Sequence, residues 1–404
     1  MKRLLLPLLA SVLSLATTST PALAQDLVVR AGKLHTVSGP VIEDGIVVIK
    51  DGKITAIGKA SEVVLPGGVD IMRCAVATPG LVDAHSVVGL AGWLNTDHDQ
   101  DQLDRTKSMQ PELRAIDAYN ARDPLVAWIR SFGVTTVHTG HAPGSIISGQ
   151  TMVVKTRGNS VEEAQLVERA MVAATIGDSA VGGDGRPGTR SKAARDLRAK
   201  LMEARSYLEV RGTDEAKPID LGLEVLSDVL AKKTRLMVTA HRAQDILTAL
   251  RIAEEFELEL VLDGASEAYL VLEELKAKKV PILLHPTMMR AYQETANSSL
   301  ETARKLVEAG LSVALQSGYE SYVPKTRVVL FEAALAAAYG LGPERALELI
   351  TLEAAKILGL DKRIGSLDVG KDGDIALYDG DPFESTTHCL GTVIEGVRVS
   401  RIRR

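Results

Sequence analysis

The sequence predicts an α/β fold in which the middle of the chain forms a (β/α)8 barrel. Short apolar runs, most ending in Gly, His or Pro, recur after "ATPGLVDAH" and include "GVTTVHTG", "RLMVTAH", "LELVLDG", "VPILLHP" and "LSVALQSG". Between most of them lie stretches such as "AQDILTALRIAEEF", whose apolar residues recur three or four positions apart. Apolar strands separated by amphipathic helices indicate a parallel sheet covered by helices. A count of about seven or eight such units favours a barrel over an open sheet.

Both ends of the chain differ from this middle, because turn residues separate short apolar pieces there. In "GIVVIKDGKITAIG" apolar residues alternate, and Asp51 and Gly52 mark a tight hairpin turn. Near the C-terminus, "GSLDVGKDGDIALYDGDP" also places Asp and Gly between apolar pieces. The two ends therefore share a β-rich texture that the middle lacks.

The first 24 residues have the features of a secretory signal peptide. Lys2 and Arg3 precede an apolar stretch from residue 4 to residue 15, which is too short to span a bilayer as a stable helix. Ala22-Leu23-Ala24 then forms a small-residue cleavage site before Gln25. We therefore expect export to the periplasm, cleavage near Ala24 and no stable membrane anchor.

Composition argues against nucleic acid as a partner. The formal net charge of the 404-residue chain is −5, and aromatic residues make up only 3%. Nucleic-acid binding needs a concentrated basic surface, which is absent from the body of the sequence. A small molecule is therefore the expected substrate or ligand.

Polar side chains stand at the carboxyl ends of several predicted strands, where barrel enzymes carry their chemistry. These residues are His85, His138, Lys155, His241, Asp263 and His285. A lone histidine at a strand end is usually structural, but several converging on one barrel mouth suggest a metal site, because imidazole is the commonest metal ligand.

The order and spacing of several motifs resemble the amidohydrolase superfamily, in its exported, imidazolonepropionase-like branch. The motifs are "VVIKDGKITAIG", "ATPGLVDAH", "GVTTVHTG", "TAHRAQDILTALRIAEEF" and "ALELITLEAAKILGLDKRIGSLDVGKDGDIALYDGDP". The resemblance implies a distorted barrel over residues 79–365. It also implies a composite β-sandwich built from residues 25–78 and 366–404. Members often form homo-oligomers, so a homo-oligomer is expected.

The two cysteines, Cys74 and Cys389, are far apart in the sequence but are able to pair in an oxidising compartment. The resemblance places both in the small composite domain. A disulfide between them is therefore one expectation, and two buried free thiols are the other.

The ligand pattern of the superfamily is only partly present. Its first-strand His-x-His falls on His85 and Val87, and its fifth-strand histidine falls on His241. The sixth-strand histidine falls on Gly264, and the eighth-strand aspartate falls on Gly318. The fourth-strand carboxylated lysine is matched to Lys155. Zinc in a catalytic site takes three protein ligands and a water, so these replacements weaken the family mechanism.

Two interpretations remain open at this point. In the first, His85, His241, Lys155 and His138 hold one Zn²⁺ or another divalent metal, and His285 is the general base. The reaction would then be hydrolysis of a C–N bond in a small amide, cyclic amide or dipeptide. Tyr319 and Glu320, which follow the eighth strand, would contact the substrate. In the second, the barrel has lost its chemistry and serves as a periplasmic binding or accessory protein.

Overall fold

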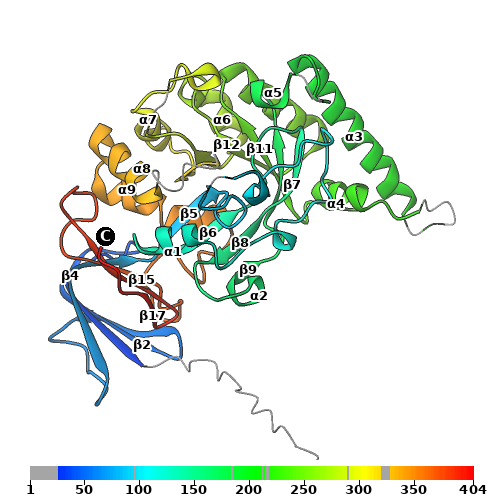
Figure 1. Cartoon of the computed structure of the whole chain (residues 1–404). Helices are drawn as coiled ribbons and strands as arrows, with labels where there is room; N and C mark the ends of the chain where they lie inside the picture. Colours follow the sequence, from blue (N-terminus) through cyan, green and yellow to red (C-terminus); the bar gives the residue numbers. More distant parts are fainter. Residues whose placement is uncertain are drawn as a thin grey trace, which may run out of the picture.

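The structure is a computed structural model that describes residues 26–94, 96–182, 185–211, 213, 218–288, 291–319 and 328–404. A β-sandwich made from both chain ends packs against a larger α/β body (Figure 1). This is the predicted class, a distorted TIM barrel with a terminal β-sandwich. The predicted signal peptide lies outside the described residues. Within the described ranges, no helix combines the length and the hydropathy needed to traverse a bilayer.

The strands of the β-sandwich domain form one continuous seven-stranded sheet with the order β17-β16-β15-β4-β1-β2-β3. Strands β1 to β4 come from the N-terminal end and β15 to β17 from the C-terminal end, so the two ends of the chain share one hydrophobic core. The strands are β1 (Leu27–Leu34), β2 (Ile42–Lys50), β3 (Lys53–Lys59), β4 (Asp70–Pro79), β15 (Ile375–Tyr378), β16 (Cys389–Ile394) and β17 (Val397–Ser400). The predicted turn between β2 and β3 is present, with positive φ at Asp51 and Gly52.

The larger body contains two strand sets that together form the distorted barrel. Strands β14, β13, β12, β11 and β10 form a parallel ladder, and β5 pairs in parallel with β6. One isolated parallel bridge between Ser86 and Gly318 connects β5 to the segment after β14. The strands are β5 (Leu81–Ser86), β6 (Val134–Thr139), β7 (Ile147–Gln150), β8 (Met152–Lys155), β9 (Gln165–Val167), β10 (Met171–Thr175), β11 (Arg235–Ala240), β12 (Leu260–Gly264), β13 (Ile282–Leu284) and β14 (Val313–Leu315).

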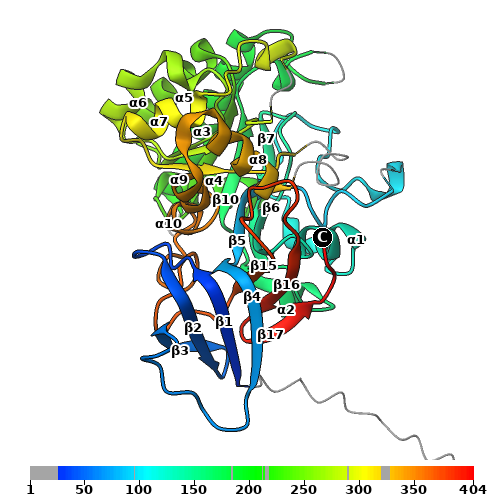
Figure 2. The same ribbon diagram turned by 90° about the vertical axis from the view of Figure 1, so that its left-hand side faces the viewer.

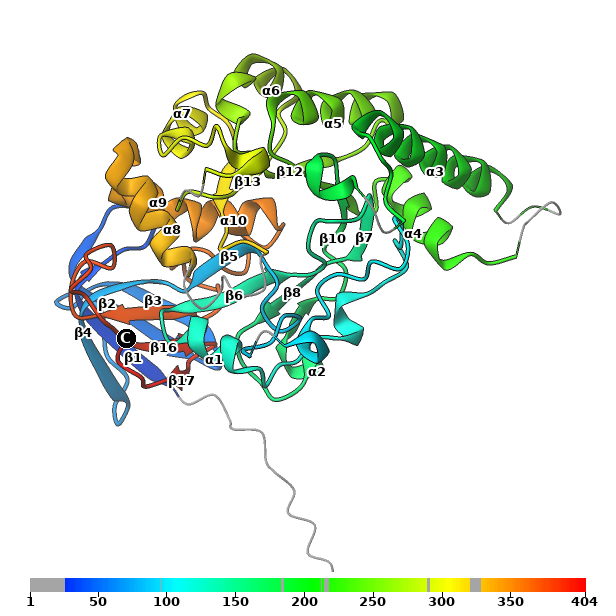
Figure 3. The same cartoon turned by 45° about the horizontal axis from the view of Figure 1, so that its top comes forward.

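Helices cover the outside of the parallel strands, as Figure 3 shows for α5, α6 and α7. Their buried apolar faces pack on the strands in one large core. The helices are α1 (Pro124–Arg130), α2 (Val161–Ala164), α3 (Arg190–Val210), α4 (Leu221–Leu230), α5 (Ala243–Phe256), α6 (Leu272–Lys278), α7 (Thr302–Glu308), α8 (Val329–Ala336), α9 (Pro343–Leu349) and α10 (Leu352–Ile357). Polar N-caps begin several of them; for example, the Thr189 side chain accepts a hydrogen bond from the Lys192 amide at the start of α3.

The main distortion of the barrel is the direction of β7 and β8, which follow β5 and β6 in the barrel and run against their neighbours. Strand β8 runs antiparallel to β6, and β7 runs antiparallel to β10. Because β7 and β8 are consecutive in the chain, they form nearly one strand that points against its neighbours. The carboxyl end of β8 therefore lies at the opposite end of the barrel from the carboxyl ends of β5, β11, β12 and β13.

The two cysteines are not paired. Cys74 lies on β4 and Cys389 on β16, and β15 runs between these strands. Strands two apart in a sheet are separated by roughly 10 Å, beyond the reach of a disulfide. Burial raises the pKa of the Cys74 thiol to about 12. Of the two expectations, the structure therefore shows two free thiols and no disulfide between Cys74 and Cys389.

Candidate active site

His85 and Asp263 form a buried pair at the carboxyl ends of β5 and β12. The His85 Nδ1 atom lies 2.8 Å from the Asp263 Oδ1 atom, and both side chains are fully buried. The carboxylate also accepts hydrogen bonds from Thr239 Oγ1 at 2.6 Å and Gln316 Nε2 at 2.7 Å. Burial alone would raise the pKa of Asp263, but the His85 imidazole and these hydrogen bonds outweigh it and lower the pKa to about 2. Asp263 is therefore an anion that orients His85.

The second ring nitrogen of His85 has a different environment. The Nε2 atom is buried and has no hydrogen-bond partner among the described residues. Because Asp263 accepts the Nδ1 proton, the lone pair of the uncharged His85 ring is the one on Nε2. An oriented imidazole with a free nitrogen is the arrangement that accepts a proton in general-base catalysis.

His241 has both ring nitrogens engaged. Its Nδ1 atom lies 2.7 Å from Ser266 Oγ, and its Nε2 atom lies 2.6 Å from the Tyr319 hydroxyl. Ser266 donates its own proton to the His285 carbonyl oxygen at 3.3 Å, so it accepts from His241 Nδ1. Nε2 then accepts from Tyr319, and the hydrogen bonds run in one direction from Tyr319 through His241 to Ser266.

Three of the predicted histidines lie around the ring of Tyr319. Its ring centroid lies 5.6 Å from that of His285, 6.2 Å from that of His85 and 6.4 Å from that of His241. Val87 packs in the same small apolar cluster as Tyr319. The structure thus brings His85, His241, His285 and Tyr319 together. Glu320, the other predicted substrate contact, lies outside the described residues.

His138 lies close to this group, but both of its ring nitrogens are occupied. Nδ1 donates to the Ala84 carbonyl oxygen at 2.6 Å, and Nε2 lies 2.7 Å from Thr151 Oγ1. Burial, together with the neighbouring His85 charge, lowers the pKa of His138 to about 3. His138 is therefore a neutral side chain that joins β6 to its neighbours.

Lys155 lies away from the histidines, which corrects the expectation that it joins them as a ligand. Its Nζ atom lies 2.6 Å from both Asp372 Oδ2 and Asp374 Oδ2, and 3.4 Å from Glu395 Oε1. The cause is the reversed direction of β8, which carries Lys155 to the sandwich side of the barrel. A carboxylated lysine there would place a third anion beside two buried carboxylates, which is unfavourable.

Two of the positions that lack the family ligands are constrained by the structure, Gly264 by its neighbours and Gly318 by its backbone conformation. A Cβ atom added to Gly264 would lie 2.6 Å from His241 Cε1, so His241 fills the space that a side chain on β12 would need. Gly318 has a φ of +98° and forms the bridge with Ser86. Among the described residues, no group of three or more His, Cys, Asp or Glu side chains is arranged to hold a metal ion. The residues that the structure describes therefore do not fit the catalytic metal of the superfamily.

Sequence reasoning missed the supporting residues of this site. Asp263 was recognised as a polar strand end but was given no role, and Ser266 and Gln316 carried no motif. Asp83 was also missed: it accepts hydrogen bonds from the Ser317 amide at 2.9 Å and from Ser317 Oγ at 2.5 Å. Burial raises the pKa of Asp83 to about 6. A usable signal existed, since Asp83 and His85 are two apart on one strand and so share a face.

Comparisons with known proteins agree with this architecture. The model of the Amidohydrolase family matches residues 76–399. An amidohydrolase structure from Thermotoga maritima MSB8 is 30% identical with a TM-score of 0.84, covering 93% of this chain and 100% of that one. An imidazolonepropionase from Solibacter usitatus is 22% identical over 401 residues, covering 91% of this chain and 93% of the relative.

A third relative, the amidohydrolase tasK of Hapsidospora irregularis, is 26% identical over 376 residues. That match covers 85% of this chain, which spans only 38% of the length of that relative. The family supports, at the coarse level of reaction class, a hydrolase acting on carbon–nitrogen bonds, and its members generally bind a divalent metal such as zinc. By the extent of the family match and by the Thermotoga maritima structure, this chain belongs to the Amidohydrolase family.

Proposed function

We propose that this protein hydrolyses a carbon–nitrogen bond of a small amide or cyclic amide with His85 as a general base and without a bound metal. One observation carries the proposal: the buried His85 is oriented through Nδ1 by the Asp263 anion, while its Nε2 has no hydrogen-bond partner in the described part of the chain. His285 was the expected base from the sequence. His85 is preferred because of its carboxylate partner, which would stabilise the imidazolium once formed.

The proposed reaction moves one proton in and out of His85. Nε2 takes a proton from water, and the resulting hydroxide forms a bond to the carbonyl carbon of the substrate. When the carbon–nitrogen bond breaks, the leaving nitrogen takes that proton from Nε2, and a carboxylic acid and an amine result; the acid then gives its proton to the solvent. Tyr319, whose proton is directed to His241, has oxygen lone pairs that would accept an N–H of the substrate.

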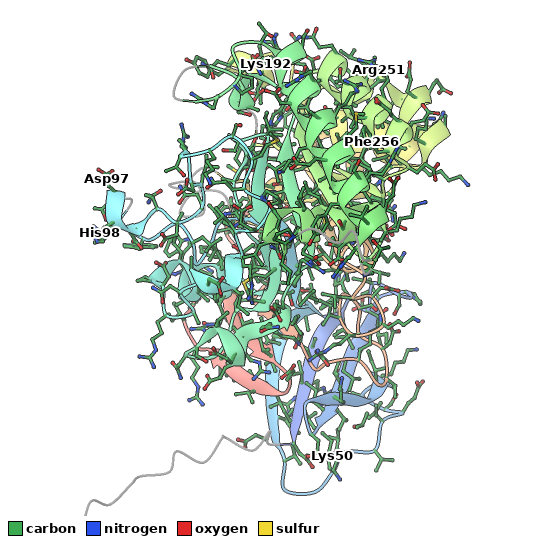
Figure 4. The ribbon with its side chains drawn as sticks, turned by 90° about the vertical axis from the view of Figure 1, so that its right-hand side faces the viewer. Lys50, Asp97, His98, Lys192, Arg251 and Phe256 are labelled. Carbon is green, nitrogen blue, oxygen red and sulfur yellow. The ribbon has the colours of Figure 1, made fainter. Side chains whose placement is uncertain are left out.

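The test is an assay of the chain beginning at Gln25 against a panel of dipeptides, N-acyl amino acids and lactams. We expect His85→Ala to lower kcat/KM by about 10³-fold, within the usual range for loss of a general base. His98→Ala is the matched control, since Figure 4 shows His98 projecting from the body, and it should leave the rate unchanged. Removal of metal with a chelator should also leave the rate unchanged.

Metal analysis of the same preparation distinguishes this proposal from a rebuilt metal site. Near-stoichiometric zinc, together with activity that a chelator abolishes and zinc restores, would reject the metal-free mechanism. It would favour a mononuclear metal site instead.

A second candidate function is ligand binding without catalysis. It is favoured by the replacement of family ligands with Val87, Gly264 and Gly318 and by the full engagement of His138 and His241 in hydrogen bonds. In this case no member of the panel would be hydrolysed, and a ligand would raise the Tm of the wild-type protein but not of a Tyr319→Ala variant.

Export and assembly into a homo-oligomer are also proposed. Export is supported by the charged start, short apolar core and Ala-x-Ala site of residues 1–24. Amino-terminal sequencing of the periplasmic form should begin at Gln25, and native mass spectrometry of that form would give the oligomeric state.

A further inference from the structure

Strand β4 has a free edge over half of its length. On one side, β1 pairs with β4 from Asp70 to Ala77. On the other side, β15 pairs only with the four residues from Val76 to Pro79. Among the described residues, no strand pairs with that side of β4 between Asp70 and Ala75. Because a sheet edge presents unpaired amide and carbonyl groups, this segment can accept another strand.

Solvent exposure changes at the residue where the pairing ends. The four residues beside β15 are all buried, whereas the six residues of the free segment are exposed or half-buried. Within that segment, Met72 and Cys74 face the sandwich core while Ile71 and Arg73 face outward. Ile71 is 39% exposed. The side chains of this segment therefore alternate between core and solvent as in a paired strand, although only β1 pairs with it.

The space beside this edge is open to solvent and has an apolar base. One cavity of about 330 Å³ is lined by Leu377 and Leu390 together with the edge residues 70–73. An adjoining cavity of about 1040 Å³ continues past Met72 and Val397. Figure 2 shows β4 on the side of the sandwich next to β15, β16 and β17. Six residues of extended chain span roughly 20 Å, so a short extended peptide matches the free segment.

The charges around the opening indicate which peptide would bind. Arg73, Arg398 and Arg401 lie along it, and none of them lies within salt-bridge distance of a described carboxylate. Arg73 interacts at longer range with Asp44, whose salt bridge is with Arg30. Arg398 donates only to carbonyl oxygens, those of Ser400 at 3.4 Å and Leu390 at 3.0 Å. Two acidic residues, Asp26 and Asp70, are also present. The guanidinium groups remain in excess, so acidic side chains on the incoming segment would be favoured.

We propose that the free edge of β4, from Asp70 to Ala75, binds an extended acidic segment of another protein as an added strand. Main-chain hydrogen bonds to β4 would provide most of the affinity. Alternate apolar side chains would cover Met72, Leu377 and Leu390, and acidic side chains would pair with Arg73 and Arg398. The site is on the sandwich and does not depend on the chemistry proposed for the barrel.

The probe for the test is the fluorescein-labelled peptide Val-Glu-Val-Glu-Val-Glu-Val, blocked at both ends, with the chain beginning at Gln25. We expect saturable binding by fluorescence anisotropy. Hydrogen exchange of those amides in residues 70–75 that point away from β1 should slow at least tenfold when peptide is bound. The same peptide with the valine at its third position replaced by proline should bind at least tenfold more weakly, because proline lacks an N–H and disfavours a paired strand.

Charge reversal checks the chemistry of recognition. The double variant Arg73→Glu with Arg398→Glu should bind the glutamate peptide at least tenfold more weakly and prefer a lysine version of it. Lys50→Glu is the matched control, because Lys50 is an exposed cation of the same sheet on β2, which β1 separates from β4, and is labelled in Figure 4. The proposal is wrong if the wild-type protein shows no saturable binding or if protection from exchange appears elsewhere. It is also wrong if the edge instead pairs two copies of this chain, seen as a dimer that Arg73→Glu dissociates.

Discussion

The Tyr319 hydroxyl lies 2.6 Å from Nε2 of His241, the histidine that the family pattern assigns to a metal. In this chain, the Tyr319 phenol forms a hydrogen bond with that ring nitrogen. Ser266 holds the other nitrogen of the same ring. The family scaffold is therefore kept, while one of its ligand positions is used for a side-chain hydrogen bond.

This pair leads to the first prediction. Tyr319→Phe removes the hydroxyl and should lower the free energy of unfolding by about 1–2 kcal/mol, because it removes a partly buried hydrogen bond and leaves the buried His241 without that partner. Urea denaturation measures the change. Tyr339→Phe is the control, since Tyr339 is 44% exposed, and it should change stability by less than about 0.5 kcal/mol. Equal effects of the two substitutions would contradict the assigned hydrogen bond.

The second prediction concerns the ion cluster between barrel and sandwich. Lys155→Met should destabilise the protein by about 3–5 kcal/mol, because it leaves the buried carboxylates of Asp372 and Asp374 without their shared cation. Lys53→Met removes a second cation from Asp372, but the Lys53 side chain is 50% exposed. It should cost only about 0–1 kcal/mol. Chemical denaturation of both variants gives the comparison, and similar losses would show that burial of Lys155 is not the cause.

The third prediction is a dependence of stability on pH through Asp263. The folded pKa is about 2 and lies below the ordinary value of 3.8, so the charged form is favoured in the folded state. The resulting stabilisation of about 2 kcal/mol is present above pH 4 and is lost as the pH falls from 4 to 2. The difference in unfolding free energy between the wild-type protein and Asp263→Asn should therefore shrink over this window.

Asp83 provides the control for this titration, because its shift has the opposite sign. Its folded pKa, raised to about 6, favours the neutral form, so stability should fall as the pH rises from about 4 to 6. Asp83→Asn should remove that fall and leave the slope between pH 2 and 4 unchanged. A variant that alters both windows would indicate a general loss of packing instead of two separate titrations.

The fourth prediction concerns the thiols. Protein purified without reductant and unfolded in guanidinium should react with Ellman's reagent at both of its cysteines, because β15 separates Cys74 from Cys389. Cys74→Ser should halve the signal and change the Tm by the same amount with or without reductant. Failure of the unreduced wild-type protein to react would mean that a disulfide forms despite the strand between the two residues.

The sequence predicted the barrel, the β-rich ends and most of the histidines that meet at the mouth. It did so because strand and helix periodicity are local, and because parallel strands carry their carboxyl ends to one face. It failed for Lys155, since nothing local in "TMVVKTRG" shows that this strand runs against its neighbours. The strand has the apolar pattern of the others, and that pattern is the same in either direction.

What the sequence alone determined is which residue types stand at which positions: His85 and His241 are present, and Val87, Gly264 and Gly318 replace the family ligands. Only the tertiary structure decided what those residues do. Asp263 meets His85 across strands that are 178 residues apart in the chain, and Tyr319 meets His241 at a separation of 78 residues. Such contacts depend on strand order, direction and register, which arise from packing of the whole barrel and are not encoded in any short segment.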